Sequence, residues 1–301
     1  MTRSASPQRA PGPAATSAEW WRQAVVYQIY PHRFPGSGAA GDLRSVISRI
    51  PYLATLGVDA VWLSPFDPSA LADFDEMTSG LHAHGIKVMV DVASDHASNQ
   101  HPWFTDALAA PPGSSATSRP VFRDGLGQAF TFDLLEAGWD AGEFLRVITD
   151  NLADAQQYGA STSWVLAGHG ATPRRVRAAV LLMLALPGSA YLDQGEELGV
   201  RELADLPGEV EAQEHDPDST LNLYRRALGW RRKLQAAETL EWMPGTGGQV
   251  LHFGRPGGWR SVTNFGSRAV PLPPGTVAAA SAPLEAGLLP ADTTAWIIPA
   301  S

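Results

Sequence analysis

The chain has 301 residues, of which 44% are hydrophobic and 18% are charged, and this mixture is typical of a folded protein with one large and one small domain. A formal net charge of -9 argues against a nucleic acid or an anionic membrane as partner, because both need a clustered positive surface. The lack of cysteine excludes disulfides and zinc–thiolate sites, and it fits a cytoplasmic location.

The first 18 residues are rich in Ala, Pro and Ser and contain no apolar core. We therefore expect residues 1–18 to form a disordered tail and not a signal peptide. The longest apolar run, 178–186, is far shorter than the roughly 20 residues of a membrane-spanning helix. The sequence thus predicts a soluble protein.

After this tail, short apolar runs alternate with amphipathic segments, which is typical of strand–helix units in a parallel sheet. Strands are predicted over 25–30, 60–63, 88–92, 130–135, 164–166 and 190–192. Helices are predicted over 42–56, 71–84, 140–158, 173–186 and 220–234. The stretch 110–127 is rich in Pro, Gly and Ser without a strand or helix period, so it is predicted to be a loop.

From residue 241 the pattern changes to short alternating strands separated by turns, such as 255–258 followed by a hairpin arm over 259–263. This pattern predicts a separate small antiparallel domain. The expected domains are therefore the tail at 1–18, an α/β domain at 19–236 and a β-sandwich-like domain at 237–301.

In parallel α/β folds the reactive groups gather at the carboxyl ends of the strands. The polar residues that follow the predicted strands are Tyr30, Asp67, 91–96, Asp133, Glu136, His169 and 194–197. This set is compatible with a sugar pocket, a general acid–base site or a weak metal site. Structural roles are equally open: the loop at 91–96 can cap a helix, and Glu196 with Glu197 can form a hydrogen-bonded structural pair.

Two other kinds of site were weighed from the residues alone. Asp91, Asp95, His96 and His101 could supply ligands for a divalent ion, but their spacing matches no recognised metal motif. No Gly-x-Ser-x-Gly sequence is present, which argues against an α/β-hydrolase. We therefore expect no metal and no cofactor.

Several longer strings resemble one enzyme family over nearly the whole chain after residue 19. The strings are "VVYQIYPHRF", "YLATLGVDAVWLSPF", "GIKVMVDVASDHASNQHPWF", "WVLAGHG", "ALPGSAYLDQGEELG" and, near the end, "WRSVTNFG" with "PADTTAWII". They resemble bacterial α-glucosidases and oligo-1,6-glucosidases of glycoside hydrolase family 13, within the α-amylase superfamily. The resemblance implies a TIM-type (β/α) barrel followed by a small antiparallel β domain.

The resemblance also implies that the chain is internally shortened. It supplies counterparts of barrel strands one, two, three, six, seven and eight, whereas strands four and five have none, with the gap at 123–128. In the family those two strands carry the nucleophilic aspartate and the acid–base glutamate. The third catalytic carboxylate belongs to an Asn-His-Asp triplet that here reads Gly168-His169-Gly170. No catalytic residue is therefore assigned.

What remains of the family's sugar pocket is Asp91, His96 and His169, which match the residues that hydrogen-bond the glucosyl ring. The resemblance thus implies a catalytically inactive or impaired α-glucosidase homologue of carbohydrate metabolism, a pseudoenzyme with weak affinity for an α-glucoside or malto-oligosaccharide. Two alternatives stay open. One is a working α-glucoside hydrolase that uses other acids, with Asp133, Glu136, Asp193 and Glu196 as candidates; the other is a noncatalytic scaffold.

The loss of two strand–helix units would leave unpaired backbone groups on the two strands that flank the gap. We predict that the strand at 88–92 lies beside the strand at 130–135, because this pairing would satisfy the backbone groups of both edges. Closing six strands needs a narrower and more tilted barrel than closing eight. An incomplete or distorted barrel of about six strand–helix units is therefore expected.

Overall fold

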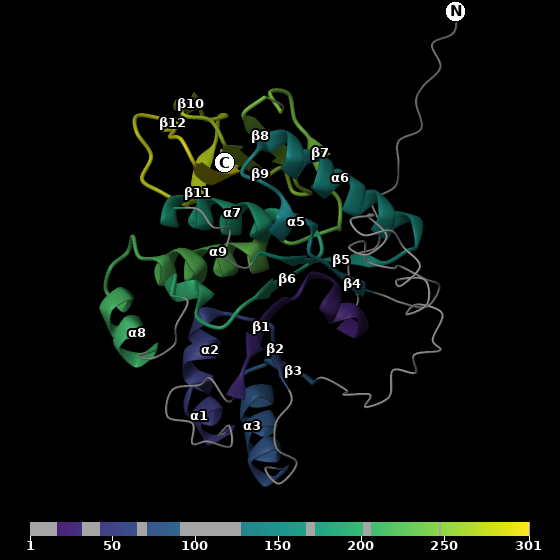
Figure 1. Ribbon diagram of the computed structural model, residues 1–301, viewed down its shortest axis with the longest axis vertical. Coiled ribbons are helices and arrows are strands. Elements are labelled where there is room, and N and C mark those ends of the chain that lie inside the picture. The colour runs from purple at the N-terminus through teal and green to yellow at the C-terminus, as the bar shows by residue number, and fades with distance from the viewer. Residues whose placement is uncertain are drawn as a thin grey trace, which may run out of the picture.

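The structure is a computed structural model, and it describes residues 17–31, 43–64, 71–90, 128–166, 172–200, 206–246 and 248–300. Its centre is a six-stranded parallel sheet (Figure 1). The strands are β1 (Val25–Ile29), β2 (Ala60–Leu63), β3 (Lys87–Val90), β4 (Gln128–Thr131), β5 (Ser161–Val165) and β6 (Ser189–Leu192). Their order in the sheet is β3-β2-β1-β6-β5-β4.

This order contradicts the predicted pairing of the third and fourth strands. Among the described residues, β3 and β4 form the two opposite edges of the sheet, and four strands lie between them. The prediction was wrong because β4 pairs with β5 and β3 pairs with β2, and each has a neighbour on one side only in the part of the chain that the structure describes. Direct closure would require all six strands to tilt more steeply. The described sheet is open, as the expectation of an incomplete barrel allows.

Helices connect and cover these strands. They are η1 (Ser17–Gln23), α1 (Leu43–Ser48), α2 (Ile50–Leu56), α3 (Leu71–Ala83), α5 (Asp133–Glu136), α6 (Ala141–Gln157), α7 (Pro173–Ala185), η4 (Glu196–Leu198), α8 (Leu206–Glu214) and α9 (Thr220–Leu234). Sequence signals fix several starts: Asp140 accepts hydrogen bonds from the backbone of α6, and Ser219 does so for α9. None of the helices in the described ranges has the length and apolar character to cross a bilayer.

Several elements differ from the sequence prediction. The helix predicted over 42–56 is broken at Arg49, because Pro51 cannot donate a backbone hydrogen bond and its ring clashes with the preceding turn. The strand predicted over 130–135 ends at Thr131, and Leu134 is buried in the helical turn α5 instead. Helix α8 was not predicted.

The described residues of the C-terminal part form short strands: β7 (Glu241–Trp242), β8 (Val250–Gly254), β9 (Arg260–Asn264), β10 (Val270–Pro271), β11 (Thr276–Ala280), β12 (Leu288–Leu289) and β13 (Thr293–Ile298). They form an antiparallel sheet of order β11-β13-β9-β8-β7 and a two-stranded ribbon of β10 with β12. The predicted turn at 255–258 joins β8 to β9, where Arg255 N donates to Trp259 O at 2.8 Å.

The two parts of the molecule share a core. Helix α7 packs between the parallel sheet and the C-terminal strands, and all residues from Ala178 to Ala185 are buried (Figure 1). On β1, Val25, Tyr27 and Ile29 contribute to this large core, whereas Val26 faces the other side of the sheet. Strand residues alternate between faces, so the parallel sheet has a helix-covered face and an inner face.

Candidate functional site

The predicted sugar-binding residues Asp91, His96 and His169 lie outside the described residues, as do Asp95 and His101 of the metal alternative. The described chain stops at Val90, the last residue of β3, and at Leu166, one residue after β5 ends. The sugar-binding assignment therefore stays a prediction. Within the described residues, no group of three His, Cys, Asp or Glu side chains could hold a metal ion.

The described part of the carboxyl edge is the loop that follows β6. Gln194 lies at the start of this loop, and its Oε1 accepts a hydrogen bond from the backbone nitrogen of Tyr30 at 2.8 Å. Tyr30 directly follows β1, which pairs with β6. Gln194 thus joins the carboxyl ends of the two central strands, and its side chain is buried.

Glu197 turns away from this edge into the layer between the sheet and the helices. Its carboxyl is fully buried and accepts hydrogen bonds from the hydroxyls of Tyr27 at 2.9 Å and Tyr52 at 2.6 Å. The Tyr27 oxygen in turn accepts from the backbone nitrogen of Gly195 at 3.0 Å. One carboxyl therefore ties together β1, α2 and the loop after β6.

Glu196 makes a second connection, to α9. The Tyr224 hydroxyl donates to Glu196 Oε1 at 2.8 Å, and the backbone nitrogen of Asp193 donates to Oε2 at 3.0 Å. No ion pair among the described residues joins Glu196 or Glu197 to a Lys or Arg. Burial raises the pKa of Glu196 to about 8 and also raises the pKa of Glu197, since both carboxyls leave water without a paired cation.

The sequence interpretation of Glu196 and Glu197 as a pair hydrogen-bonded to backbone amides holds in part, since Asp193 N donates to Glu196. Their main donors, however, are the hydroxyls of Tyr27, Tyr52 and Tyr224, which sequence reasoning did not single out. The sequence did contain a signal for these bonds: each tyrosine occupies a core position of its strand or helix. A buried tyrosine hydroxyl usually needs a hydrogen-bond partner.

The other acids proposed for an alternative hydrolysis also have structural contacts. Asp133 accepts a hydrogen bond from Asn151 Nδ2 at 3.0 Å, and Asp193 accepts one from the backbone of Gln194 at 3.1 Å. Glu136 ends the short helix α5 and is exposed. Among the described residues no hydrogen bond links any two of these acids.

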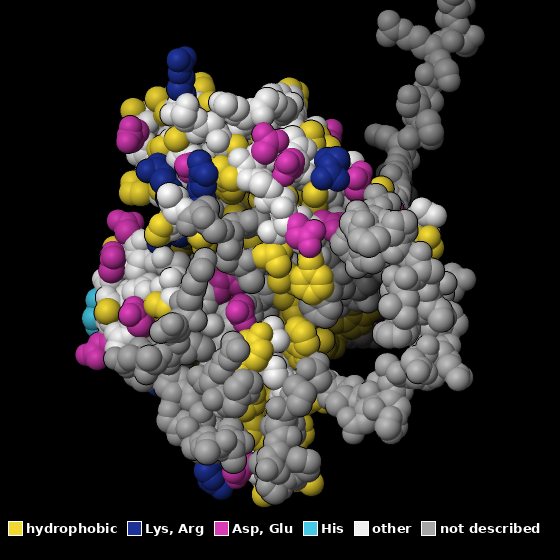
Figure 2. Space-filling model, in the orientation of Figure 1, with side chains coloured by type: hydrophobic (Ala, Val, Ile, Leu, Met, Phe, Trp, Pro, Cys, Tyr) yellow, Lys and Arg dark blue, Asp and Glu magenta, His cyan; other side chains and the backbone are white. Residues whose placement is uncertain are grey.

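The inner face of the sheet is apolar and aromatic. Tyr191 is buried there, and Trp62 contacts it edge-on with ring centroids 6.0 Å apart. Met89 and Val165 are partly exposed on the same face. Figure 2 shows hydrophobic side chains gathered at the middle of the molecule, over the region of the parallel sheet, where the described surface is hollowed.

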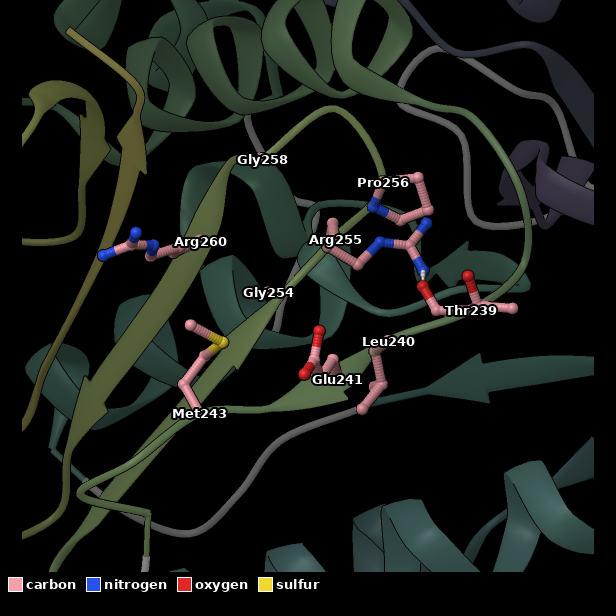
Figure 3. A pocket seen from close by; sticks show the side chains of 9 residues that line it. All are labelled: Thr239, Leu240, Glu241, Met243, Gly254, Arg255, Pro256, Gly258 and Arg260. Atoms are coloured by element: carbon pink, nitrogen blue, oxygen red, sulfur yellow. Dashed lines mark hydrogen bonds between the residues drawn. The ribbon is translucent and has the colours of Figure 1, made fainter. Parts of the chain in front are cut away.

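A separate pocket with a volume of about 330 Å³ lies in the C-terminal part, among β7, β8 and β9 (Figure 3). Glu241, Gly254 and Arg260 are register neighbours across these strands, and the side chain of Met243 packs against Gly254. Arg255 points toward Thr239 O, to which it donates at 2.7 Å, while Arg260 points the other way. Because its charged groups diverge, this pocket is not the candidate site.

Comparison with known proteins tests the resemblance to the α-amylase family. The sequence profile of the α-amylase catalytic domain matches residues 28–72. The resemblance to the α-amylase family is therefore confirmed.

Individual relatives support the same resemblance. The trehalose-6-phosphate hydrolase of Escherichia coli (strain K12) is 42% identical over 112 residues, which are 30% of this chain and 20% of that enzyme. The oligo-1,6-glucosidase of Parageobacillus thermoglucosidasius is 39% identical over 110 residues, which are 29% of this chain and 20% of that enzyme. The sequence match thus spans about a fifth of the length of these curated relatives.

Solved structures give the same fold over a longer range. The isomaltulose synthase of Klebsiella sp. LX3 superposes with a TM-score of 0.71 at 15% identity, covering 94% of this chain and 100% of that one. The α-glucosyl transfer enzyme XgtA superposes with a TM-score of 0.65 at 18% identity, covering 97% and 100%. At this identity the likeness establishes the fold, which is of the TIM-barrel type, although the described sheet is not closed.

Proposed function

We propose that this chain binds α-glucosides at the carboxyl edge of its parallel sheet and does not hydrolyse them. The observation that carries the proposal is the strand order, in which β3 and β4 are opposite edges of a six-stranded sheet. The units that would carry the family's nucleophile and acid–base residue have no counterpart in the sequence between these strands. Names such as oligo-1,6-glucosidase among the relatives support an α-glucoside as ligand.

Retaining hydrolysis requires two carboxyl groups at a defined separation. It needs a carboxylate nucleophile about 5 to 5.5 Å from an acid–base carboxyl. Glu196 and Glu197 are held by tyrosines and backbone within the helix layer, and Asp133 is held by Asn151. These bonds favour structural roles for the acids that remain.

The activity half of the proposal is tested with p-nitrophenyl α-glucoside and maltose. We expect no hydrolysis above a mock preparation, because without a nucleophile no covalent intermediate forms. Hydrolysis that disappears in a Glu196→Gln or Asp133→Asn variant would support the alternative of a working enzyme with other acids.

The binding half is tested by calorimetry with maltose. Asp91, His96 and His169 are the proposed ring contacts, and each hydrogen bond should contribute only about 0.5 to 1.5 kcal/mol, so the dissociation constant should be millimolar. An Asp91→Ala, His169→Ala double variant should lose this binding. Unchanged binding in the double variant would refute the assignment, and no binding by the unaltered chain would favour a noncatalytic scaffold.

A further inference from the structure

Strand β11 forms one edge of the five-stranded C-terminal sheet. In the order β11-β13-β9-β8-β7 it pairs with β13 on one side only. On its other side, no hydrogen bond from any described residue reaches the backbone of 276–280. Unpaired N–H and C=O groups along a strand edge form a template for pairing with a further strand.

The start of this edge is exposed to solvent. Thr276 is exposed and Val277 is 41% exposed, as are the preceding Pro274 and Gly275. Ala279, in contrast, is buried in the core that the sheet shares with the helices. One face of β11 is thus anchored in the protein, while the open backbone edge and a β-branched side chain remain accessible.

The segment around β11 carries no charge. No Asp, Glu, Lys or Arg occurs from residue 269 to 284, although 18% of the chain is charged and its formal net charge is -9. Depletion of charged residues is typical of the centre of a protein–protein contact. Two copies of this acidic chain can therefore meet at β11 without bringing like charges together.

Other edges of the two larger sheets, where the structure describes their side chains, are less suited to this. Strand β7 starts with Glu241 and β3 starts with the exposed Lys87. If either edge paired with its own copy, two like charges would lie on closely spaced strands, which is destabilising. The charge pattern thus favours β11 for contact between two copies.

We propose that β11 pairs antiparallel with β11 of a second copy of this chain, so that the two C-terminal sheets join across a twofold axis. The contact is isologous, because the same patch serves both copies. A second copy is the occupant that fits: an uncharged edge offers a charged partner no ion pair, whereas antiparallel self-pairing satisfies the same backbone groups in both chains. The proposal does not depend on sugar binding.

The length and regularity of the edge set the strength of this contact. The strand has five residues, and its register with β13 shifts between Val277 and Ala279, which is a bulge that interrupts regular pairing. Interfaces of about 1,600 Å² have dissociation constants of about 1 μM at the weak end, so this smaller contact should have one of about 100 μM. The dimer should therefore form reversibly at high concentration.

Sedimentation velocity of the full chain tests the proposal. Between about 5 and 500 μM, the weight-average mass should rise from that of one chain toward that of two. Val277→Lys should stay monomeric over this range, because it places like charges at the joined edges. Val90→Lys is the matched control: Val90 is a 46% exposed valine at the end of the edge strand β3, and this variant should dimerise as the unaltered chain does.

A chain that stays monomeric at the highest concentration would overturn the proposal. Dimerisation that Val277→Lys leaves unchanged, or that Val90→Lys also removes, would overturn it as well.

A second measurement locates the contact without a change at Val277. The chain has no cysteine, so Thr276→Cys provides a single attachment point for a nitroxide spin label. Mixed with isotope-labelled unaltered chain, this protein should broaden the amide resonances of 276–280. A label on Ala153→Cys, at an exposed position of α6, should not broaden them. A dimer in which the label at position 276 leaves the resonances of 276–280 unchanged would show that the contact lies elsewhere and would refute the proposal.

Discussion

Among single residues, Glu196 should make the stability of the fold depend on pH. Its pKa is raised by burial from the ordinary value of 4.5 to about 8, which means that the folded chain prefers the protonated acid. A group with a raised folded-state pKa stabilises the fold fully below its unfolded pKa, and this contribution is lost as the pH rises through the folded value. Stability should therefore fall between about pH 4.5 and pH 8.

Replacing Glu196 by Gln should remove this loss, because the amide does not ionise. We expect the free energy of unfolding of Glu196→Gln, relative to the unaltered chain, to rise steadily from pH 5 to pH 8.5 in urea titrations. Glu197 is present in both proteins and does not enter the difference directly. Glu211→Gln, at an exposed position of α8, should give a difference that does not change with pH; a flat difference for Glu196→Gln would contradict the assigned pKa direction.

Ala286 is an exposed residue with a left-handed backbone, at φ of +48°. An L side chain there costs about 1–2 kcal/mol, whereas glycine adopts the conformation freely but loses more chain entropy on folding. Ala286→Gly should therefore raise the free energy of unfolding by about 0.5–1 kcal/mol. The same change at Ala153, inside α6, should lower it by about 1 kcal/mol. Destabilisation at both positions would show that Ala286 is not strained.

At the scale of elements, Arg231 fastens the end of α9 to the amino-terminal side of the sheet. Its guanidinium donates to the backbone oxygens of Leu184, of Leu186 at 3.1 Å and of Gly188 at 2.6 Å. It also reaches Gln23 O at 3.3 Å, and the side chain is 3% exposed. Burial lowers the pKa of Arg231 to about 10, which still leaves it charged at neutral pH.

Lysine cannot reproduce this set of contacts, because its ammonium is a compact charge and not a planar fork. Arg231→Lys should lower the free energy of unfolding by about 2–4 kcal/mol, since several buried carbonyl groups lose their donors. Arg232→Lys, whose side chain is 61% exposed, should change it by less than about 0.5 kcal/mol. Equal effects of the two substitutions in denaturant titrations would contradict the role given to Arg231.

How well the sequence predicted each element depended on how its residues are buried. Strand β2 and helix α9 begin and end where the pattern predicted, because apolar period and capping residues agree there. Strand β5 begins at Ser161, three residues before the predicted start, since its first residues are polar yet buried. Polar residues that are satisfied only by tertiary contacts give no local hydrophobic signal.

In the candidate site, too, tertiary contacts could not be predicted from the local sequence. The set of residues after the strands included Tyr30 and Gln194, and local pattern was enough to place them at the carboxyl edge. The bond between them joins positions 164 residues apart, and the tyrosines that hold Glu196 and Glu197 come from three other elements. Contacts of this kind depend on the packing of the whole fold, so sequence spacing does not reveal them.

At the scale of the whole molecule, the open sheet predicts a gradient of backbone protection. Within the described ranges, β1 and β6 have partners on both sides, whereas β3 and β4 each have one. Edge strands open locally at a lower free energy than central ones. In hydrogen exchange at neutral pH, amides of β1 should therefore exchange at least about tenfold more slowly than those of β3 and β4, a difference of about 1.4 kcal/mol. Equal protection of all six strands would indicate a closed barrel.

The sheet order is also where sequence reasoning failed at this scale. The location of the missing units, inferred from the family resemblance, stays a prediction, whereas the pairing of β3 with β4, inferred from the need to satisfy their backbone groups, is contradicted by the order of the described strands. In the described sheet, β3 pairs only with β2 and β4 only with β5, so the two edge strands lie apart. Pairing across the gap would have forced a new tilt on every strand, which the cores of both sheet faces oppose.

Binding without hydrolysis is tested most directly by proton magnetic resonance of maltose mixed with the purified chain. In one sample, saturation transfer from protein to sugar reports binding, and the anomeric signals of free glucose report hydrolysis. The account predicts saturation transfer to maltose, lost in the Asp91→Ala, His169→Ala variant, with no glucose above a mock preparation over a day. Glucose that accumulates in proportion to the amount of protein, or the absence of any saturation transfer, would contradict it.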